Sequence, residues 1–259
     1  MDIIKIYNQY LEQKNKQNGI YRKQIAEKRY SASSSGMCLR KHYYNVNDYG
    51  RLPIDDKSLR TLRLGTVFGR DIEDAMKWHN INQHSITSKH ATIETEEFVE
   101  HPTLPICGHF DILVVDENRK GQLIDIKTAN TWKYQGIFGR KKDPNPSTNY
   151  QMQLGTYAWL LNETKDLCDE VTSMELIYFN KNDARMQSAN VPLEFIGIAE
   201  DYWEMLFANN GNLPPIGQMV PAYDWECGKY CDFRHVCDSP LIKEKDKPKI
   251  TKNKEALIA

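Results

Sequence analysis

Residues 108–115 read GHFDILVV, and residues 122–128 read QLIDIKT. Both segments are short and rich in Ile, Leu and Val, and residues 116–121 between them carry turn-forming types. This pattern predicts a β-hairpin. Because side chains alternate between the two faces of a strand, Asp125 and Lys127 should point to the same side. Pairing across the turn can then bring Asp111 beside Asp125.

The predicted hairpin therefore gathers two carboxylates and one amine. Adjacent carboxylates repel each other, and a divalent cation relieves that repulsion. Lys127 could hold an attacking water or stabilise a phosphate as it is attacked, which is the equipment for metal-assisted phosphodiester hydrolysis. A bare Asp-x-Lys is more often an exposed strand face with an ion pair. Here Asp111 and Asp125 belong to apolar strands, where an unpaired carboxylate is costly.

The hairpin motif resembles the PD-(D/E)XK nuclease superfamily, and its close match is the RecB-like exonuclease branch. Downstream, residues 153–157 read QLGTY, which resembles the Gln-x-x-x-Tyr motif of that branch. Their i, i+4 spacing puts the Gln and the Tyr on one helix face, able to contact the active site or the bound strand. The resemblance implies catalytic roles for Asp111, Asp125 and Lys127, with Gln153 and Tyr157 positioning the scissile strand.

Upstream, residues 64–73 read LGTVFGRDIE and resemble the family's first motif, in which a histidine usually binds metal. Gly69 stands at the histidine position, and Glu73 is the position that still carries over. The resemblance implies that Mg²⁺ or Mn²⁺ is held by Glu73, Asp111, Asp125 and the carbonyl of Ile126. Gly69 favours a rival interpretation, a non-catalytic DNA-binding module derived from a nuclease.

Three cysteines, Cys227, Cys231 and Cys237, fall within eleven residues, and such a cluster predicts a metal site. Cys38 is the natural fourth ligand. This arrangement of one distant and three neighbouring cysteines resembles the [4Fe–4S] cluster of certain RecB-like nucleases, such as the CRISPR-adaptation exonucleases. Four thiolates also suit zinc, and spacing alone does not separate the two. Zinc sites more often show paired Cys-x2-Cys units, so the resemblance favours iron–sulfur.

The resemblance implies an α/β fold: a restriction-endonuclease-like core with a mixed central sheet flanked by helices, plus a helical metal-cluster lobe. We expect a basic N-terminal helical segment at 1–32, the nuclease domain with its iron–sulfur lobe at 33–239, and a flexible Lys-rich tail at 240–259. Local patterns predict a helix at 58–79 begun by Ser58, with Leu62, Val67, Phe68, Ile72, Ala75 and Met76 on its buried side. Further expected elements are an N-terminal apolar helical stripe (Ile3, Ile4, Tyr7, Tyr10, Leu11), a strand at 91–99, a loop at 130–149, a helix at 150–161, a hairpin formed by 174–179 and 184–191, and a helix at 194–208.

The composition of the 259-residue chain is 40% hydrophobic and 27% charged, with a mean hydropathy of -0.65. These values fit a globular protein and exclude wholesale disorder. The net charge of -1 averages a body of -8 at 31–239 with basic ends of +4 at 1–30 and +3 at 240–259. Near-neutrality therefore does not exclude a nucleic-acid partner.

We accordingly expect a metal-dependent DNA exonuclease acting in recombination, repair or viral DNA replication, with proteins of those processes as further partners. Phosphate contacts are expected from Lys133, Arg140, Lys141 and Lys142. No apolar run approaches the roughly 18 residues of a membrane span. A secretory leader is not recognisable either, so the expected location is intracellular and cytoplasmic.

Overall fold

The computed structural model describes residues 2–16, 27–82, 91–140, 148–220, 223 and 226–243. The chain divides into two compact units. We call residues 31–36 and 59–201 the sheet unit, and residues 1–30, 37–58 and 202–259 the cysteine unit. The two are described separately below.

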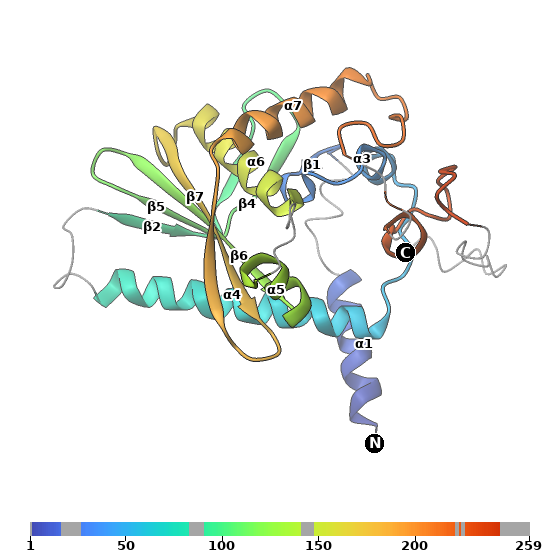
Figure 1. Ribbon diagram of the computed structural model, residues 1–259, viewed down its shortest axis with the longest axis horizontal. Coiled ribbons are helices and arrows are strands. Elements are labelled where there is room, and N and C mark those ends of the chain that lie inside the picture. Colours follow the sequence, from blue (N-terminus) through green and yellow to red (C-terminus); the bar gives the residue numbers. More distant parts are fainter. Residues whose placement is uncertain are drawn as a thin grey trace. The chain divides into compact units, whose positions relative to one another are not determined.

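The sheet unit is built on a five-stranded mixed sheet with the order β2-β5-β6-β7-β8. Its strands are β2 (Thr92–Thr95), β5 (Ile112–Val115), β6 (Lys120–Ala129), β7 (Glu170–Asn180) and β8 (Met186–Val191). The central pair β6 and β7 is parallel, and the other neighbours are antiparallel. Helices α4 (Asp56–Asn82) and α6 (Thr148–Thr164) lie on opposite sides of this sheet (Figure 1). The expected mixed sheet flanked by helices is confirmed.

The hairpin that carries the predicted catalytic residues is also confirmed. Strands β5 and β6 pair in antiparallel register, with Ile112 opposite Ile124 and Leu113 opposite Leu123. Both leucines are fully buried. This register places Asp111, one residue before β5, level with Asp125.

Several predicted elements have different bounds. Helix α4 begins at Asp56, because the Asp55 carboxylate accepts a hydrogen bond from the Ser58 backbone N–H at 3.0 Å; Ser58 is therefore not the N-cap. The expected loop at 130–149 contains helix α5 (Thr131–Phe138), whose N-cap Asn130 accepts from the Lys133 N–H at 2.9 Å. The last predicted helix, α7 (Glu194–Ala208), has the expected bounds.

The expected strand at 91–99 is interrupted at Glu96. That residue adopts a left-handed backbone conformation with φ of +56°, which ends β2 and separates it from β3 (Phe98–Glu100). Strand β3 pairs instead with β4 (Ile106–His109) in a second sheet of order β1-β4-β3, where β1 is Tyr30–Ser31. The short helix η1 (Ala32–Ser34) follows β1.

The burial predicted for α4 is wrong at several positions. Leu62 is 57% exposed and Val67 is 49% exposed, and Ala75 is exposed as well. Phe68 does face the sheet, where its ring stacks on Phe179 with 4.0 Å between centroids. An amphipathic pattern identifies an apolar face, but it does not say whether that face is covered.

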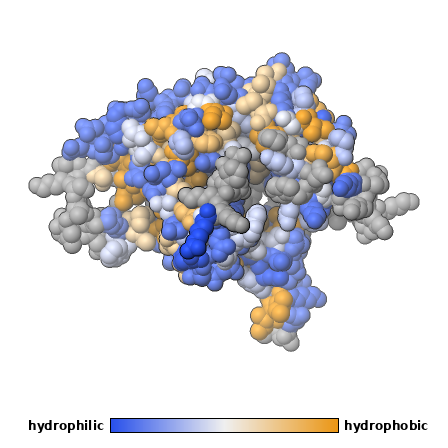
Figure 2. Space-filling view, in the orientation of Figure 1, coloured by the Kyte–Doolittle hydropathy of each residue, from blue (hydrophilic) through white to orange (hydrophobic). Residues whose placement is uncertain are grey.

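The cysteine unit contains helices α1 (Ile3–Lys16) and α3 (Leu39–Val46) and the π-helix η2 (Glu226–Tyr230). A small core joins Tyr44, Cys231 and Phe233. Only Leu11 of the apolar stripe predicted on α1 is buried, and Ile3 and Ile4 are about 70% exposed. Figure 2 shows an apolar patch at the lower tip of this helix. Within the described ranges, no helix is both long and apolar enough to cross a membrane.

Replacing Gly155 with alanine is expected to destabilise the sheet unit by about 2 kcal/mol, because overpacking costs energy where backbone cannot give way. A Cβ atom at Gly155 of α6 would lie 2.1 Å from the Phe195 carbonyl oxygen of α7. The matched control is Gly197→Ala on α7, where a Cβ meets nothing within 4 Å. Thermal unfolding of both variants should show a lower midpoint for Gly155→Ala alone; equal midpoints would contradict the close helix contact.

Candidate active site and cysteine pocket

The end of the β5–β6 hairpin brings Asp111 and Asp125 together. The Asp111 carboxylate accepts a hydrogen bond of 2.6 Å from the Ile126 backbone N–H, which fixes it against β6. Asp125 is only 1% exposed. Burial raises the pKa of Asp111, and burial followed by the Asp111 charge raises the pKa of Asp125 to about 7. Two carboxyl groups thus share a site that disfavours their joint ionisation.

Lys127 is the one cation in direct contact with this pair among the described residues. Its ammonium lies 2.6 Å from Asp125 Oδ2 and donates to Gln153 Oε1 at 3.1 Å. Burial opposes the charge on Lys127, but the Asp125 and Asp111 carboxylates outweigh it and raise the pKa of Lys127. The Gln153 amide also donates to Asp125 Oδ1 at 3.1 Å. Gln153 therefore bridges the two ends of the ion pair.

Tyr157 reaches the same centre from one turn further along α6. It is 2% exposed, its hydroxyl bonds to Gln153, and burial raises its pKa well above the usual value. A Cβ at Gly108 would lie 2.9 Å from the Tyr157 ring, so glycine at 108 makes room for this packing. The buried position of Tyr157 suits a contact with the active site rather than with a bound strand.

Glu73 lies on α4 beside a carboxylate that the sequence motifs missed, Glu96. Partial burial of Glu96, together with the charges of Glu73 and Asp111 and a hydrogen bond to Glu73, raises the pKa of Glu96 to about 7. The Glu96 backbone N–H also donates to the Asp111 carbonyl at 3.1 Å. The sequence signal for Glu96 was the cluster of acidic residues at 94–97. An uninterrupted strand at 91–99 would have placed these acids on both faces of the sheet rather than together.

Raising the pH is expected to destabilise the metal-free protein between about pH 4 and pH 7. Asp125 and Glu96 have pKa values of about 7 when folded, whereas carboxyl groups in an unfolded chain titrate near pH 4. The folded protein therefore binds protons that the unfolded chain has released, and stability falls across this window.

The melting temperature of chelator-treated protein, measured from pH 5 to pH 8, tests this slope. Glu96→Gln should flatten the profile, and the neighbouring Glu97→Gln should leave it unchanged. Mg²⁺ should restore stability mainly at the higher pH, since a cation favours the ionised carboxylates. A profile that is identical in both variants would contradict the assignment to Glu96.

The predicted phosphate contacts are only partly within the described residues. The Lys133 ammonium, in the first turn of α5, lies 4.2 Å from the centroid of the Tyr150 ring, and Lys127 lies 5.0 Å from the same ring. Tyr150 thereby connects Lys133 to the carboxylate centre. Arg140 is exposed, and Lys141 and Lys142 fall outside the described ranges.

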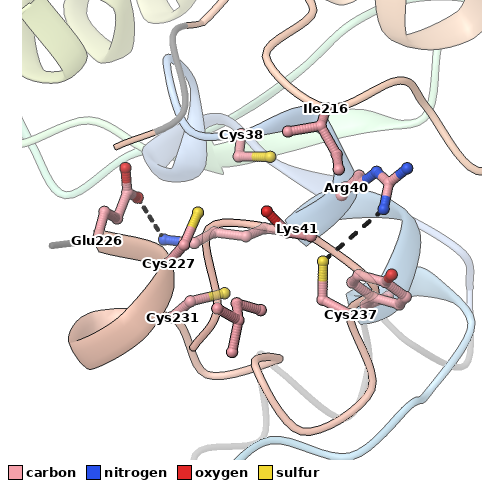
Figure 3. A pocket seen from close by; sticks show the side chains of 11 residues that line it. Cys38, Arg40, Lys41, Ile216, Glu226, Cys227, Cys231 and Cys237 are labelled. Carbon is pink, nitrogen blue, oxygen red and sulfur yellow. Dashed lines mark hydrogen bonds and ion pairs between the residues drawn. The ribbon is translucent and has the colours of Figure 1, made fainter. Parts of the chain in front are cut away.

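The four predicted cysteine ligands line one pocket in the cysteine unit. Cys38 comes from the residue before α3, Cys227 from η2, and Cys231 and Cys237 from the segment after it. Figure 3 shows their side chains gathered around the pocket, together with Arg40 and Lys41. Cys107 and Cys168 are buried and do not line it. The structure thus groups the four cysteines that the sequence grouped.

Charge and burial shape this pocket. Burial raises the pKa of Cys38, Cys227 and Cys231, the last to about 11. These three thiols therefore stay protonated unless a bound cation stabilises the thiolates. Arg40 donates to Cys237 Sγ at 3.8 Å and pairs with Asp238, and Lys41 pairs with Glu226 at 2.8 Å.

Neither the carboxylate centre nor the cysteine pocket has its side chains converged on one metal position. In the part of the chain that the structure describes, no three His, Cys, Asp or Glu side chains stand close enough to hold one metal ion together. Without a cation, the carboxylates repel each other and the protonated thiols do not attract one another. The donor types fit metal binding, and the side chains would have to move closer together as a metal binds.

Comparisons with known proteins give one family. The family model described as "PD-(D/E)XK nuclease superfamily" matches residues 37–238, a range that contains the carboxylate centre and all four pocket cysteines. Among solved structures, "Crystal structure of SSO0001" matches with a TM-score of 0.48 and 20% identity, covering 84% of this chain and 94% of that one. No curated protein matches.

Proposed function

Because the chain belongs to the PD-(D/E)XK nuclease superfamily, we propose that it is a metal-dependent DNA exonuclease acting in recombination, repair or viral DNA replication. The observation that carries this proposal is the meeting of Asp111, Asp125 and Lys127 in one buried set, bridged by Gln153. A purely structural ion pair would need one carboxylate. The second raises the energy of the site unless a cation is bound.

Asp111, Asp125, Glu73 and the carbonyl of Ile126 are the groups proposed to hold Mg²⁺ or Mn²⁺. A bound divalent ion would supply positive charge to the phosphate and activate a water. Gly69 leaves the set without its family histidine, and a Cβ there would lie 3.8 Å from Glu73 Oε1. An all-oxygen set of this kind suits hard cations better than zinc.

Lys127 has a second role in this proposal. Its ammonium is fixed by Asp125 on one side and by Gln153 on the other. It is therefore oriented before substrate arrives, and it can hold an attacking water or a phosphate oxygen. Tyr157 holds Gln153 in turn and so acts through that amide.

Digestion of end-labelled single- and double-stranded DNA tests the activity. The wild type should release nucleotides with Mg²⁺ or Mn²⁺ and none with a chelator, and Lys127→Met should be slower by about a hundredfold or more. Lys120→Met is the matched control, because Lys120 lies at the far end of the same strand and pairs there with Glu170. Equally slow release by wild type and Lys127→Met would leave the rival, a DNA-binding module without catalysis.

We further propose that Cys38, Cys227, Cys231 and Cys237 ligate a [4Fe–4S] cluster. Their common pocket and the Arg40 donor at Cys237 support this, since hydrogen bonds to sulfur stabilise such clusters. Anaerobically purified protein should be brown, absorb at about 400 nm and contain iron and sulfide. Colourless protein with stoichiometric zinc would replace the cluster by a zinc site.

A further inference from the structure

The exposed apolar face of α4 borders a groove in the sheet unit. The groove has a volume of about 470 Å³ and lies between α4 and the ends of β6 and β7. Its apolar wall includes Leu64, Val67 and the stacked rings of Phe68 and Phe179. Leu64 is 58% exposed and Val67 is 49% exposed. This volume is within the range of about 300–1,000 Å³ that small-molecule sites occupy.

The charged groups at the groove indicate what it would bind. Arg63, Arg70 and Lys181 line it, and they outnumber the acids Asp71 and Asp74. Basic side chains beside an apolar and aromatic wall match a polyanion that also presents flat apolar faces. An unpaired nucleic-acid strand has both features, because its phosphates are charged and its bases are free to stack. In a duplex the base faces are stacked on each other and cannot reach such a wall.

The groove approaches the carboxylate centre along α4, where Arg70 of the groove and Glu73 of the centre lie one turn apart. On the sheet side the groove is lined by Thr128, which points to the face of β6 opposite to Lys127, toward α4; a Cβ at Gly65 of α4 would lie 3.3 Å from the Thr128 hydroxyl. Arg70 lies close enough to Glu96 for its charge to act on that carboxyl. Lys181 lines the groove after the end of β7, where its backbone N–H donates to the Ala129 carbonyl at 2.8 Å.

We propose that this groove binds unpaired nucleotides of the strand that is being cut, with a base against Leu64 and Val67 and phosphates at Arg63, Arg70 and Lys181. The inference rests on the proposed function and makes it more specific, since it names a strand with unpaired nucleotides as the substrate. Non-sequence-specific binding follows from the chemistry, because every base has a face that can stack.

Fluorescence anisotropy with a labelled oligothymidylate of about 20 nucleotides, in the presence of a chelator, measures this binding apart from cleavage. Val67→Asp places a charge in the groove at an exposed position and should raise Kd about tenfold, the loss of roughly one base contact. Arg63→Ala should raise Kd and reduce its salt dependence. Leu62→Asp is the matched control, because Leu62 is also exposed on α4, at 57% against 49% for Val67, but does not line the groove.

The two variants separate the outcomes. A higher Kd in Val67→Asp than in Leu62→Asp, with blunt duplex binding unchanged, supports the groove. Equal Kd values in the two variants overturn it, and so does an equal loss of duplex binding. A third outcome is that the wild type cleaves DNA while Val67→Asp and Leu62→Asp cleave single strands equally well. That result would refute the role of the groove and keep the nuclease activity. Groove-dependent binding without any metal-dependent cleavage would keep the groove and refute the nuclease.

Discussion

An Asp111→Asn protein is expected to fold as the wild type does and to lose at least about a hundredfold of its DNA hydrolysis. Outer-shell changes at metal sites already cost about 10- to 100-fold, and Asp111 is proposed as a direct ligand. Asparagine keeps an oxygen that can accept the 2.6 Å hydrogen bond from the Ile126 N–H. The substitution therefore removes charge without removing the local structure.

Asp116→Asn is the matched control for this variant. Asp116 lies at the other end of the same hairpin, where its carboxylate accepts from the Asn118 and Lys120 backbone N–H groups. Its substitution by asparagine removes the same charge far from the carboxylate centre along β5 and β6. Nuclease rates should separate the two variants, and so should the rise of the melting temperature on adding Mg²⁺, which Asp111→Asn should abolish. Equal rates in both would place the metal elsewhere.

The carboxylate centre was predictable because local rules fix it. A turn of defined length sets the register of β5 and β6, and this register brings Asp111 to Asp125. Helical spacing places Gln153 and Tyr157 on one face of α6. From this face Gln153 bonds to Asp125 and Lys127, and Tyr157 bonds to Gln153. Strand and helix periodicity thus carried the essential geometry.

Glu96 was not predictable from periodicity. Its approach to Glu73 depends on a left-handed residue that no glycine or asparagine announces. The uncovered face of α4 is a similar case: the apolar pattern of Leu62 and Val67 is present in the sequence, but its covering depends on which elements pack beside it. Helix α5 was not predicted, because its only sequence signal is the N-cap Asn130, and the basic residues that follow were interpreted as part of a loop.

The grouping of Cys38 with Cys227, Cys231 and Cys237 has a different basis. Cys38 lies about 190 positions before the other three in the chain, and no local rule joins it to them. The prediction rested on chemistry, because three clustered thiols indicate a metal site with a missing fourth ligand. The pocket of the cysteine unit places the four together with the aromatic core at Tyr44 and Phe233. The same unit contains segments from the N-terminal and the C-terminal parts of the chain.

Removing one pocket cysteine should therefore cost more stability than any other cysteine substitution. Cys231→Ala is expected to lower the melting temperature of the cysteine unit by about 10 °C, because a metal cross-link that closes so long a loop is worth about 3–5 kcal/mol. Cys168→Ala, at a fully buried cysteine of the sheet unit that does not line the pocket, should cost only about 1 kcal/mol. Iron or zinc content should fall in the first variant alone. Equal melting temperatures and equal metal content in the two variants would show that the four cysteines hold no metal, and that the pocket is stabilised only by the packing of Tyr44 and Phe233.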